Sequence, residues 1–260
     1  MFRILLAVFV LIGLQAAPAA ADCTADNLTR VAGGDECLVI RTFNAGAGAK
    51  TLIVFIHGDG SRGGASDYLY SRAERYGRDG VVAVGLIRPG YYDSNDNWST
   101  GASYRGAGDG YRDTVVDAVA GAVAALKAHH GADRVVLVGH SGGAAISGVI
   151  LGRHPGLADA ALLAACPCHV PDWRIMRRGQ NTWTRSLSPH EVESGIPAGT
   201  RIVAVTGAED GNTRSAIARD YVKRLRARGI DAEFVEVPDA GHNKVTRTDA
   251  FHAAIERLLE

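Results

Sequence analysis

The stretch that most restricts the fold of this chain runs from residue 134 to residue 153. An apolar, strand-forming run at 134–138 leads into the letters G-H-S-G-G at 139–143, and a helical pattern follows to about residue 153. The five letters have the form G-x-S-x-G. Glycines on both sides of such a serine are needed where a strand turns sharply into a helix, because larger side chains there would collide with their neighbours. The pattern predicts a strand, a tight turn and a helix, with the Ser141 hydroxyl raised above the edge of a sheet.

The same letters also fit an ordinary tight turn in a glycine-rich chain. A serine hydroxyl is a poor nucleophile until a base takes its proton and a third group orients that base. The interpretation of Ser141 therefore depends on whether the chain also supplies a base, an acid and donors for an oxyanion.

Strand-like and helix-like segments alternate along most of the chain. Apolar runs predict strands at 38–43, 51–56, 81–87, 134–138, 160–165, 201–206 and 232–237. Helical spacing predicts helices at 67–78, 109–130, 142–153, 213–228 and 245–259. This rhythm predicts an α/β protein with a mostly parallel sheet covered by helices on both faces. The first two strands are expected to form a hairpin-like pair.

Two segments interrupt the rhythm. Residues 91–110 are rich in Tyr, Asn, Asp, Ser and Gly and predict a long surface loop beside the site. Residues 166–199 contain two tryptophans, several arginines and helix-breaking residues, and predict a cap-like insertion over the site. The arginines between 174 and 185 fit either an acidic substrate or a solvated charged face, of which the second is the commoner explanation.

The beginning of the chain has the composition of an export signal. Residues 1–21 carry an early arginine, an apolar run and a small-residue cleavage site, which predicts a signal peptide followed by one α/β domain over 22–260. The apolar run is shorter than the ~20 residues that a spanning helix needs, so an uncleaved membrane anchor is the weaker alternative. A secreted or periplasmic location without membrane attachment is expected. Lys and Arg balance Asp and Glu at 28 each, which gives no sign of a nucleic-acid partner.

Export permits disulfide bonds, and the four cysteines form two local groups. The simplest connectivity joins Cys23 to Cys37 and Cys166 to Cys168, although three connectivities are possible for four cysteines. A metal site with His169 is the less favoured alternative, because Cys-x-Cys-His has no second ligand pair at zinc-like spacing.

His242 is the best candidate for the base. It follows the last predicted strand and precedes the last helix, and loops at the carboxyl ends of strands are where open α/β sheets build their sites. Glu209 and Asp210 leave the preceding strand at the same edge and compete for the role of the acid. Asp210 is preferred, since Asn212 after it suggests a tight turn, and Glu209 stays the alternative.

The chain order Ser141, Asp210, His242 is that of α/β-hydrolases and differs from that of chymotrypsin and subtilisin. Over nearly all of the expected mature chain, the sequence resembles the serine hydrolases of this superfamily, either the esterase and lipase branch or the prolyl-oligopeptidase-like branch. The letters H-G-D-G at 57–60 are similar to the oxyanion loop of the family. The resemblance implies the α/β-hydrolase fold and an oxyanion hole made by the backbone N–H of Gly142 with that of Asp59 or Gly60.

A further set of aromatic residues follows the third predicted strand. Arg88-Pro89-Gly90-Tyr91-Tyr92 resembles a loop common in the family, and Tyr91, Tyr92 and Trp98 are candidates for lining the substrate pocket. Packing within their own loop is an equally good explanation for these three rings.

These residues together predict a serine hydrolase that cleaves a carboxylic ester or a related acyl bond through an acyl-enzyme on Ser141. No metal or organic cofactor is expected, and the expected partner is a small ester or a short peptide. The first alternative is a serine peptidase of prolyl-oligopeptidase-like type, which is less favoured because no N-terminal propeller is recognised in the chain. The second alternative is a non-catalytic binding protein on the same fold, of which the loss of a triad residue would be the mark. The natural substrate and the oligomeric state are not predicted.

Overall fold

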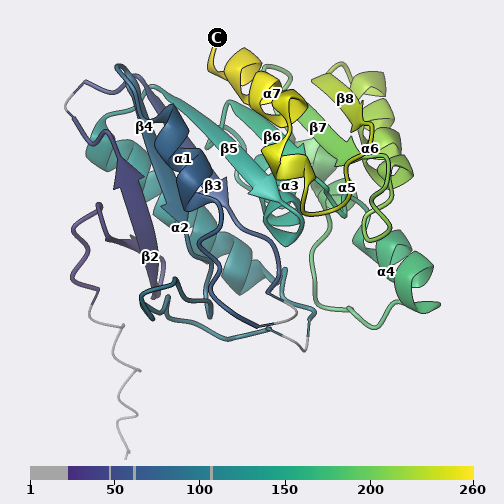
Figure 1. Ribbon diagram of the computed structural model, residues 1–260, viewed down its shortest axis with the longest axis horizontal. Helices are drawn as coiled ribbons and strands as arrows, with labels where there is room; N and C mark the ends of the chain where they lie inside the picture. The colour runs from purple at the N-terminus through teal and green to yellow at the C-terminus, as the bar shows by residue number, and fades with distance from the viewer. Residues whose placement is uncertain (1–22, 47, 61–62, 106–107) are drawn as a thin grey trace, which may run out of the picture.

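One sheet of eight strands forms the centre of the molecule (Figure 1). The computed structural model describes residues 23–46, 48–60, 63–105 and 108–260, so the signal peptide expected at 1–21 lies outside the described residues. The strands are β1 (Arg30–Gly33), β2 (Glu36–Phe43), β3 (Thr51–Ile56), β4 (Val81–Leu86), β5 (Arg134–His140), β6 (Ala160–Ala164), β7 (Arg201–Gly207) and β8 (Asp231–Val237). Their spatial order is β1-β2-β4-β3-β5-β6-β7-β8. The β1–β2 and β2–β4 pairs are antiparallel and every other neighbouring pair is parallel, which confirms the mostly parallel sheet.

Helices cover both faces of this sheet. They are α1 (Tyr70–Tyr76), α2 (Asp113–His130), α3 (Gly142–Arg153), α4 (Val170–Arg178), α5 (Pro189–Val192), α6 (Ser215–Ala227) and α7 (Asp249–Leu259), with 3-10 turns η1 (Glu193–Gly195) and η2 (Val245–Arg247). Side chains of α1 and α7 pack on one face, and in Figure 1 these helices lie in front of the sheet. Side chains of α2, α3 and α6 pack on the other face. Within the described ranges, no helix combines the length and the apolar character that crossing a bilayer would require.

The central strand β3 illustrates why the apolar runs become strands. Its six residues are all buried. Successive side chains point to opposite faces, so Leu52 and Val54 join the core beneath α2 and α3, while Ile53 and Phe55 join the core beneath α1 and α7. A strand with both faces covered reads as a continuous apolar run, which is how this segment appears in the sequence.

The expected pairing of 38–43 with 51–56 is wrong. The neighbour of β2 is β4, with Ile40 opposite Leu86, and β4 separates β2 from β3. All six residues of β4 are buried, so this strand is stable only with a partner along each edge. The chain leaves β2 through Asn44, whose backbone has a left-handed conformation. The short strand β1 was not predicted, because its four residues carry too little apolar signal.

The local disulfide pairing is confirmed. Cys23 is bonded to Cys37 and Cys166 to Cys168. The first bond ties the beginning of the described chain to β2, and the second follows β6 at the edge of the sheet where the site lies. The segment 166–199 forms α4, α5, η1 and connecting loops, and makes one wall of a pocket rather than a clearly defined cap.

Candidate active site

Ser141 lies on the turn between β5 and α3, as the sequence predicts. Its backbone has φ 54° and ψ −118°, a strained conformation for a residue other than glycine. A Cβ atom on Gly139 would collide with the backbone of Gly143 and Ala144, and one on Gly143 would collide with the backbone oxygen of Ile56. The two glycines are therefore required by the close approach of β3, β5 and α3, and together they present the serine at the carboxyl edge of the sheet.

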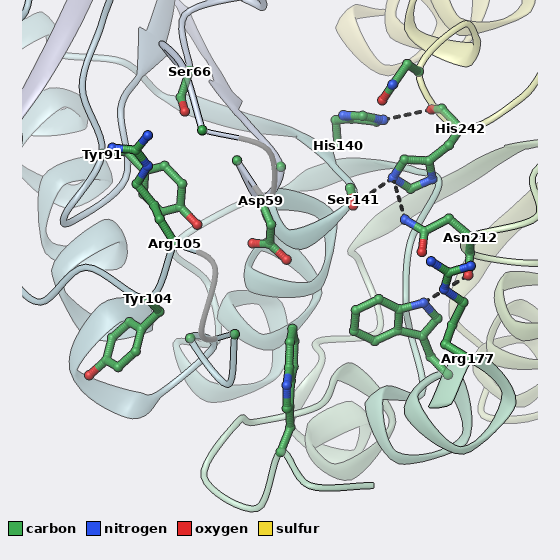
Figure 2. Close-up of a pocket in the computed structure, with 18 of the residues that line it drawn as sticks. Asp59, Ser66, Tyr91, Tyr104, Arg105, His140, Ser141, Arg177, Asn212 and His242 are labelled. Carbon is green, nitrogen blue, oxygen red and sulfur yellow. Dashed lines mark hydrogen bonds between the residues drawn. The ribbon is translucent and has the colours of Figure 1, made fainter. Parts of the chain in front are cut away.

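His242 and Asp210 meet Ser141 at this edge. The Nε2 atom of His242 lies 2.9 Å from the Oγ atom of Ser141 (Figure 2). Its Nδ1 atom lies 2.9 Å from Oδ2 of Asp210. Both residues occupy loops that follow parallel strands, β8 and β7 respectively. Glu209, the other carboxylate considered from the sequence, is exposed, and Asp210 is the one in contact with His242.

The Asp210 side chain is completely buried and has several donors around it. Its Oδ1 atom accepts hydrogen bonds from the backbone N–H groups of Asn212 and Thr213 at 2.8 and 2.9 Å. Its Oδ2 atom accepts a hydrogen bond from the Thr213 hydroxyl at 2.7 Å. Burial alone would raise the pKa of the carboxyl, but the hydrogen bonds from His242 and Thr213 outweigh it and hold the pKa below its usual value. Asp210 is therefore an anion that accepts the Nδ1–H of His242.

This arrangement fixes the direction of proton transfer. With Nδ1–H donating to Asp210, the other ring nitrogen of His242 is an acceptor and faces the Ser141 hydroxyl. A base placed in this way can take the serine proton when the oxygen attacks a carbonyl carbon. The site thus has the parts of an acyl-transfer centre.

Thr213 and Asn212 complete the surroundings of His242 and were not recognised as site residues from the sequence. The Oγ1 atom of Thr213 lies 3.2 Å from Nδ1 of His242, and the Nδ2 atom of Asn212 lies 3.1 Å from Nε2. The turn expected after Asp210 could have predicted them, since an aspartate in a turn often accepts hydrogen bonds from the backbone N–H groups two and three residues further along the chain.

His140 lies next to the nucleophile but supports the loops around it. Its Nε2–H donates to the backbone oxygen of His242 at 2.9 Å, and its Nδ1 atom accepts the Tyr68 hydroxyl at 2.6 Å. The same hydroxyl oxygen accepts the backbone N–H of Gly58 at 2.7 Å. Burial, together with the nearby His242, lowers the pKa of His140 to about 4, so the ring is neutral and keeps one donor and one acceptor. This series of hydrogen bonds, here called the Tyr68–His140 relay, joins the expected oxyanion loop at 57–60 to the loop that carries His242.

The loop at 57–60 is held from below by His57 and Arg88. The Nδ1–H of His57 donates to the Gly58 oxygen at 2.7 Å, and its Nε2 atom accepts a hydrogen bond from the backbone N–H of Arg88 at 2.9 Å, so His57 holds the loop. The Arg88 guanidinium is buried and donates to the His57 oxygen and to Oδ1 of Asp59. Burial alone would lower the pKa of Arg88, but Tyr91 and Asp59 raise it above its ordinary value.

The Asp59 carboxylate lies beside Gly142. A Cβ atom on Gly142 would collide with Oδ1 of Asp59, so the glycine is needed for this approach. Arg88 holds Oδ1 at 2.9 Å and the hydroxyl of Tyr111 donates to Oδ2 at 2.6 Å. A negative charge next to an expected oxyanion donor is thus neutralised by a buried cation. Gly142 is the first residue of α3, where backbone N–H groups have no partner within the helix.

A pocket of about 580 Å³ opens around Ser141. Tyr91 lines it, as one interpretation of the sequence expected, while Tyr92 and Trp98 lie outside the lining and stack on each other at 4.5 Å. The segment 166–199 contributes side chains to one wall, and these are Trp173, Arg174, Arg177, Arg178 and Trp183. Arg185, from the same segment, is not part of the lining.

Comparison with known proteins assigns this chain to a family. The model of the prolyl oligopeptidase family matches residues 78–259. A search among curated proteins gave no match.

Solved structures match over most of the chain. An esterase of Pyrococcus furiosus, Pf2001, has a TM-score of 0.66 at 12% identity and covers 88% of each chain. The esterase Est1E of Butyrivibrio proteoclasticus, solved with ferulic acid bound, has a TM-score of 0.66 at 14% identity, covering 88% of this chain and 97% of its own. An acylaminoacyl peptidase of Pyrococcus horikoshii has a TM-score of 0.67 at 16% identity, covering 88% of this chain but 40% of its own. At these identities the likeness establishes the α/β-hydrolase fold.

Proposed function

Because this chain belongs to the prolyl oligopeptidase family of serine hydrolases, we propose that it cleaves a carboxylic ester through an acyl-enzyme on Ser141. The observation that carries the proposal is the continuous hydrogen-bonded series from the Ser141 hydroxyl through His242 to Asp210, with 2.9 Å at both steps.

In this mechanism the Ser141 oxygen attacks the carbonyl carbon while Nε2 of His242 takes its proton. Asp210 holds the imidazole in the required tautomer and stabilises its positive form. The proton then passes to the leaving alcohol as the ester bond breaks. Water repeats the sequence on the acyl-enzyme and releases the acid.

The oxyanion of the tetrahedral intermediate is held by the backbone N–H of Gly142 and that of Asp59 or Gly60. Donors placed in advance where charge develops contribute about 3 kcal/mol each to the stabilisation of the transition state. The relay from Tyr68 through His140 supports this assignment, because it links the loop at 57–60 to the loop of His242.

Two observations favour an ester as the substrate. Both esterases named above are matched over 88% or more of their own length. The pocket around Ser141 is also lined by several aromatic side chains, which suit a small acyl or alcohol group.

A serine peptidase is the second candidate function. It is favoured by the family match and by the likeness to an acylaminoacyl peptidase, of whose chain 40% is covered. Amide and ester substrates with the same acyl group would separate the two candidates.

We place the protein outside the cytoplasm, in a secreted or periplasmic location. Two disulfide bonds support this compartment, since such bonds persist in oxidising environments.

The test is covalent labelling with a fluorophosphonate probe, followed by hydrolysis of 4-nitrophenyl esters and matched aminoacyl 4-nitroanilides. Wild type should be labelled, Ser141→Ala should not, and Ser71→Ala, which removes an exposed serine of α1, should be labelled like wild type. Faster turnover of esters than of anilides supports the ester assignment, and the reverse would favour the peptidase. Undiminished labelling of Ser141→Ala would show that the nucleophile is elsewhere, and absence of labelling in wild type would favour a non-catalytic binding protein.

A further inference from the structure

The pocket around Ser141 has a positive lining although the chain as a whole has equal numbers of acidic and basic residues. Among the described residues that line it, Asp59 is the single acidic side chain. Four arginines line the same space, and these are Arg105, Arg174, Arg177 and Arg178. The charge of the pocket is therefore a local feature that the composition of the chain does not explain.

Asp59 does not compensate these arginines. Its two carboxylate oxygens are engaged by the buried Arg88 at 2.9 Å and by the Tyr111 hydroxyl at 2.6 Å. The negative charge of Asp59 is thus balanced by Arg88. The four arginines of the lining therefore give the pocket an excess of positive charge.

Arg174 is the best-defined of the four. Its guanidinium lies over the rings of Trp183 and Trp173, at 4.4 and 5.4 Å from the two ring centroids. The side chain is half-buried and its Nε atom is buried without a hydrogen-bond partner. Within the part of the chain that the structure describes, no carboxylate lies within 4.0 Å of it. A cation that is held by aromatic rings and lacks a counter-ion is available to an anionic ligand.

Arg105 repeats this arrangement on the opposite side of the pocket. Its guanidinium lies 4.6 Å from the Tyr92 ring centroid and 5.6 Å from that of Trp98, and its Nε atom is also buried without a partner. Figure 2 shows Arg105 on one side of Ser141 and Arg177 on the other. Both walls of the pocket that contains the nucleophile therefore carry arginine side chains.

The α4 wall is also tied to the base. The indole N–H of Trp173 donates to the Asn212 oxygen at 2.9 Å, and the Asn212 amide nitrogen lies 3.1 Å from Nε2 of His242. The wall that carries Arg174 and Arg177 is therefore joined by hydrogen bonds to the residue that acts as the base.

We infer that the substrate carries an anionic group, a carboxylate or another oxyanion, which the arginines of the two walls bind beside the ester bond. This inference rests on the proposed esterase function. The planar guanidinium donates two parallel N–H groups and matches the geometry of such anions. The position of the anion in the acyl half or in the alcohol half of the ester is distinguished by the experiment.

The test compares pairs of esters that differ in one charge. Mono-4-nitrophenyl adipate and its methyl ester place the charge in the acyl half, and 3-acetoxybenzoate and its methyl ester place it in the alcohol half. The 4-nitrophenyl ester of 5-(trimethylammonio)pentanoate is the cationic counterpart. In at least one pair, kcat/KM should be about tenfold higher for the anion at low salt, and the preference should shrink as salt is added.

Variants identify the source of the preference. The ratio of kcat/KM for anionic over neutral ester should fall towards one in Arg105→Gln/Arg174→Gln. Arg185→Gln removes an arginine of the same segment that is outside the lining, and should keep the wild-type ratio. A ratio of one or less in both pairs for wild type, a preference for the cationic ester, or an unchanged ratio in the double variant would overturn the inference.

Binding to Ser141→Ala separates this inference from the proposed function. Calorimetry with 3-hydroxybenzoate and its methyl ester needs no turnover, and tighter binding of the carboxylate, lost in the double arginine variant, supports the anion site even if no ester is cleaved. Hydrolysis of neutral and anionic esters at equal rates, with equal binding, would leave the esterase assignment in place and refute the anion site alone.

Discussion

The Nε2–H of His140 donates to the backbone oxygen of His242 at 2.9 Å, so the residue before the nucleophile holds the loop that carries the base. The other nitrogen of the same ring accepts the Tyr68 hydroxyl, which in turn accepts the Gly58 N–H. The positions of the base and of the loop at 57–60 are thus coupled through one buried, neutral imidazole.

Tyr68→Phe should lower kcat by about tenfold, because the backbone N–H of Gly58 and the Nδ1 atom of His140 both lose their hydrogen-bond partner. KM should change less than kcat, since the relay holds backbone and not the reacting part of the substrate. The control is Tyr70→Phe, which removes a hydroxyl that is buried without a partner and should leave kcat and the thermal midpoint near those of wild type. Equal kinetics of the two variants would refute the role of the relay.

The choice of acid is tested by comparing two neighbouring carboxylates. Asp210→Asn should reduce kcat on the order of a thousandfold or more, because the amide cannot stabilise the positive imidazole and favours the wrong tautomer. Glu209→Gln should be close to wild type, since Glu209 is exposed and Asp210 contacts His242. Similar losses in the two variants, measured on the same nitrophenyl ester, would contradict the assignment.

The buried pair of Arg88 and Asp59 should be important for stability. Arg88→Met leaves the Asp59 carboxylate without its cation, and should lower the free energy of unfolding by about 3–5 kcal/mol in urea titrations. The double variant Arg88→Met/Asp59→Asn should lose less than the sum of the single variants, because it removes the unpaired charge. Arg219→Met breaks an exposed pair with Glu236 and should cost less than about 1 kcal/mol. Additive losses at Arg88 and Asp59 would show that the two residues do not interact as described.

The residues that bear the chemistry were the most predictable part of the site. Ser141, Asp210 and His242 each follow an apolar run, and the carboxyl ends of parallel strands meet at one edge of a sheet. Their order in the chain therefore predicted a meeting in space. Asn212 and Thr213 follow from the same turn, but the turn signal does not say which side chain reaches the histidine.

The residues that support the site were harder to predict for identifiable physical reasons. The contact of Tyr68 with His140 joins residues 72 positions apart, and no local pattern encodes such a distance. Arg88 appeared in the sequence as the end of a strand, and its burial depends on Asp59 and Tyr111 arriving from other elements. The predicted pairing of 38–43 with 51–56 was wrong for a similar reason. Strand β4 lies between these two segments and pairs with both, and this order depends on contacts between strands that are distant in the sequence.

The stability of the protein should fall as the pH is lowered from about 6.5 towards 4. An imidazole in an unfolded chain has a pKa of about 6.5, whereas burial and the neighbouring His242 lower the pKa of His140 to about 4 in the folded protein. Between these values the unfolded chain binds a proton that the folded protein does not, so folding is favoured above this range and the contribution is lost as the pH falls through it. For His140 the loss amounts to about 3 kcal/mol.

Other histidines act in the same direction. The pKa of His190 is also lowered to about 4, and burial holds that of His57 well below its ordinary value, so the total slope should exceed one proton. The measurement is the free energy of unfolding in urea at several pH values. His140→Gln keeps a donor for the His242 oxygen but does not titrate, so it should reduce the slope by about one proton over this range. An unchanged slope in His140→Gln would mean that His140 is not held neutral by the fold, and the relay that depends on its neutral ring would have to be revised.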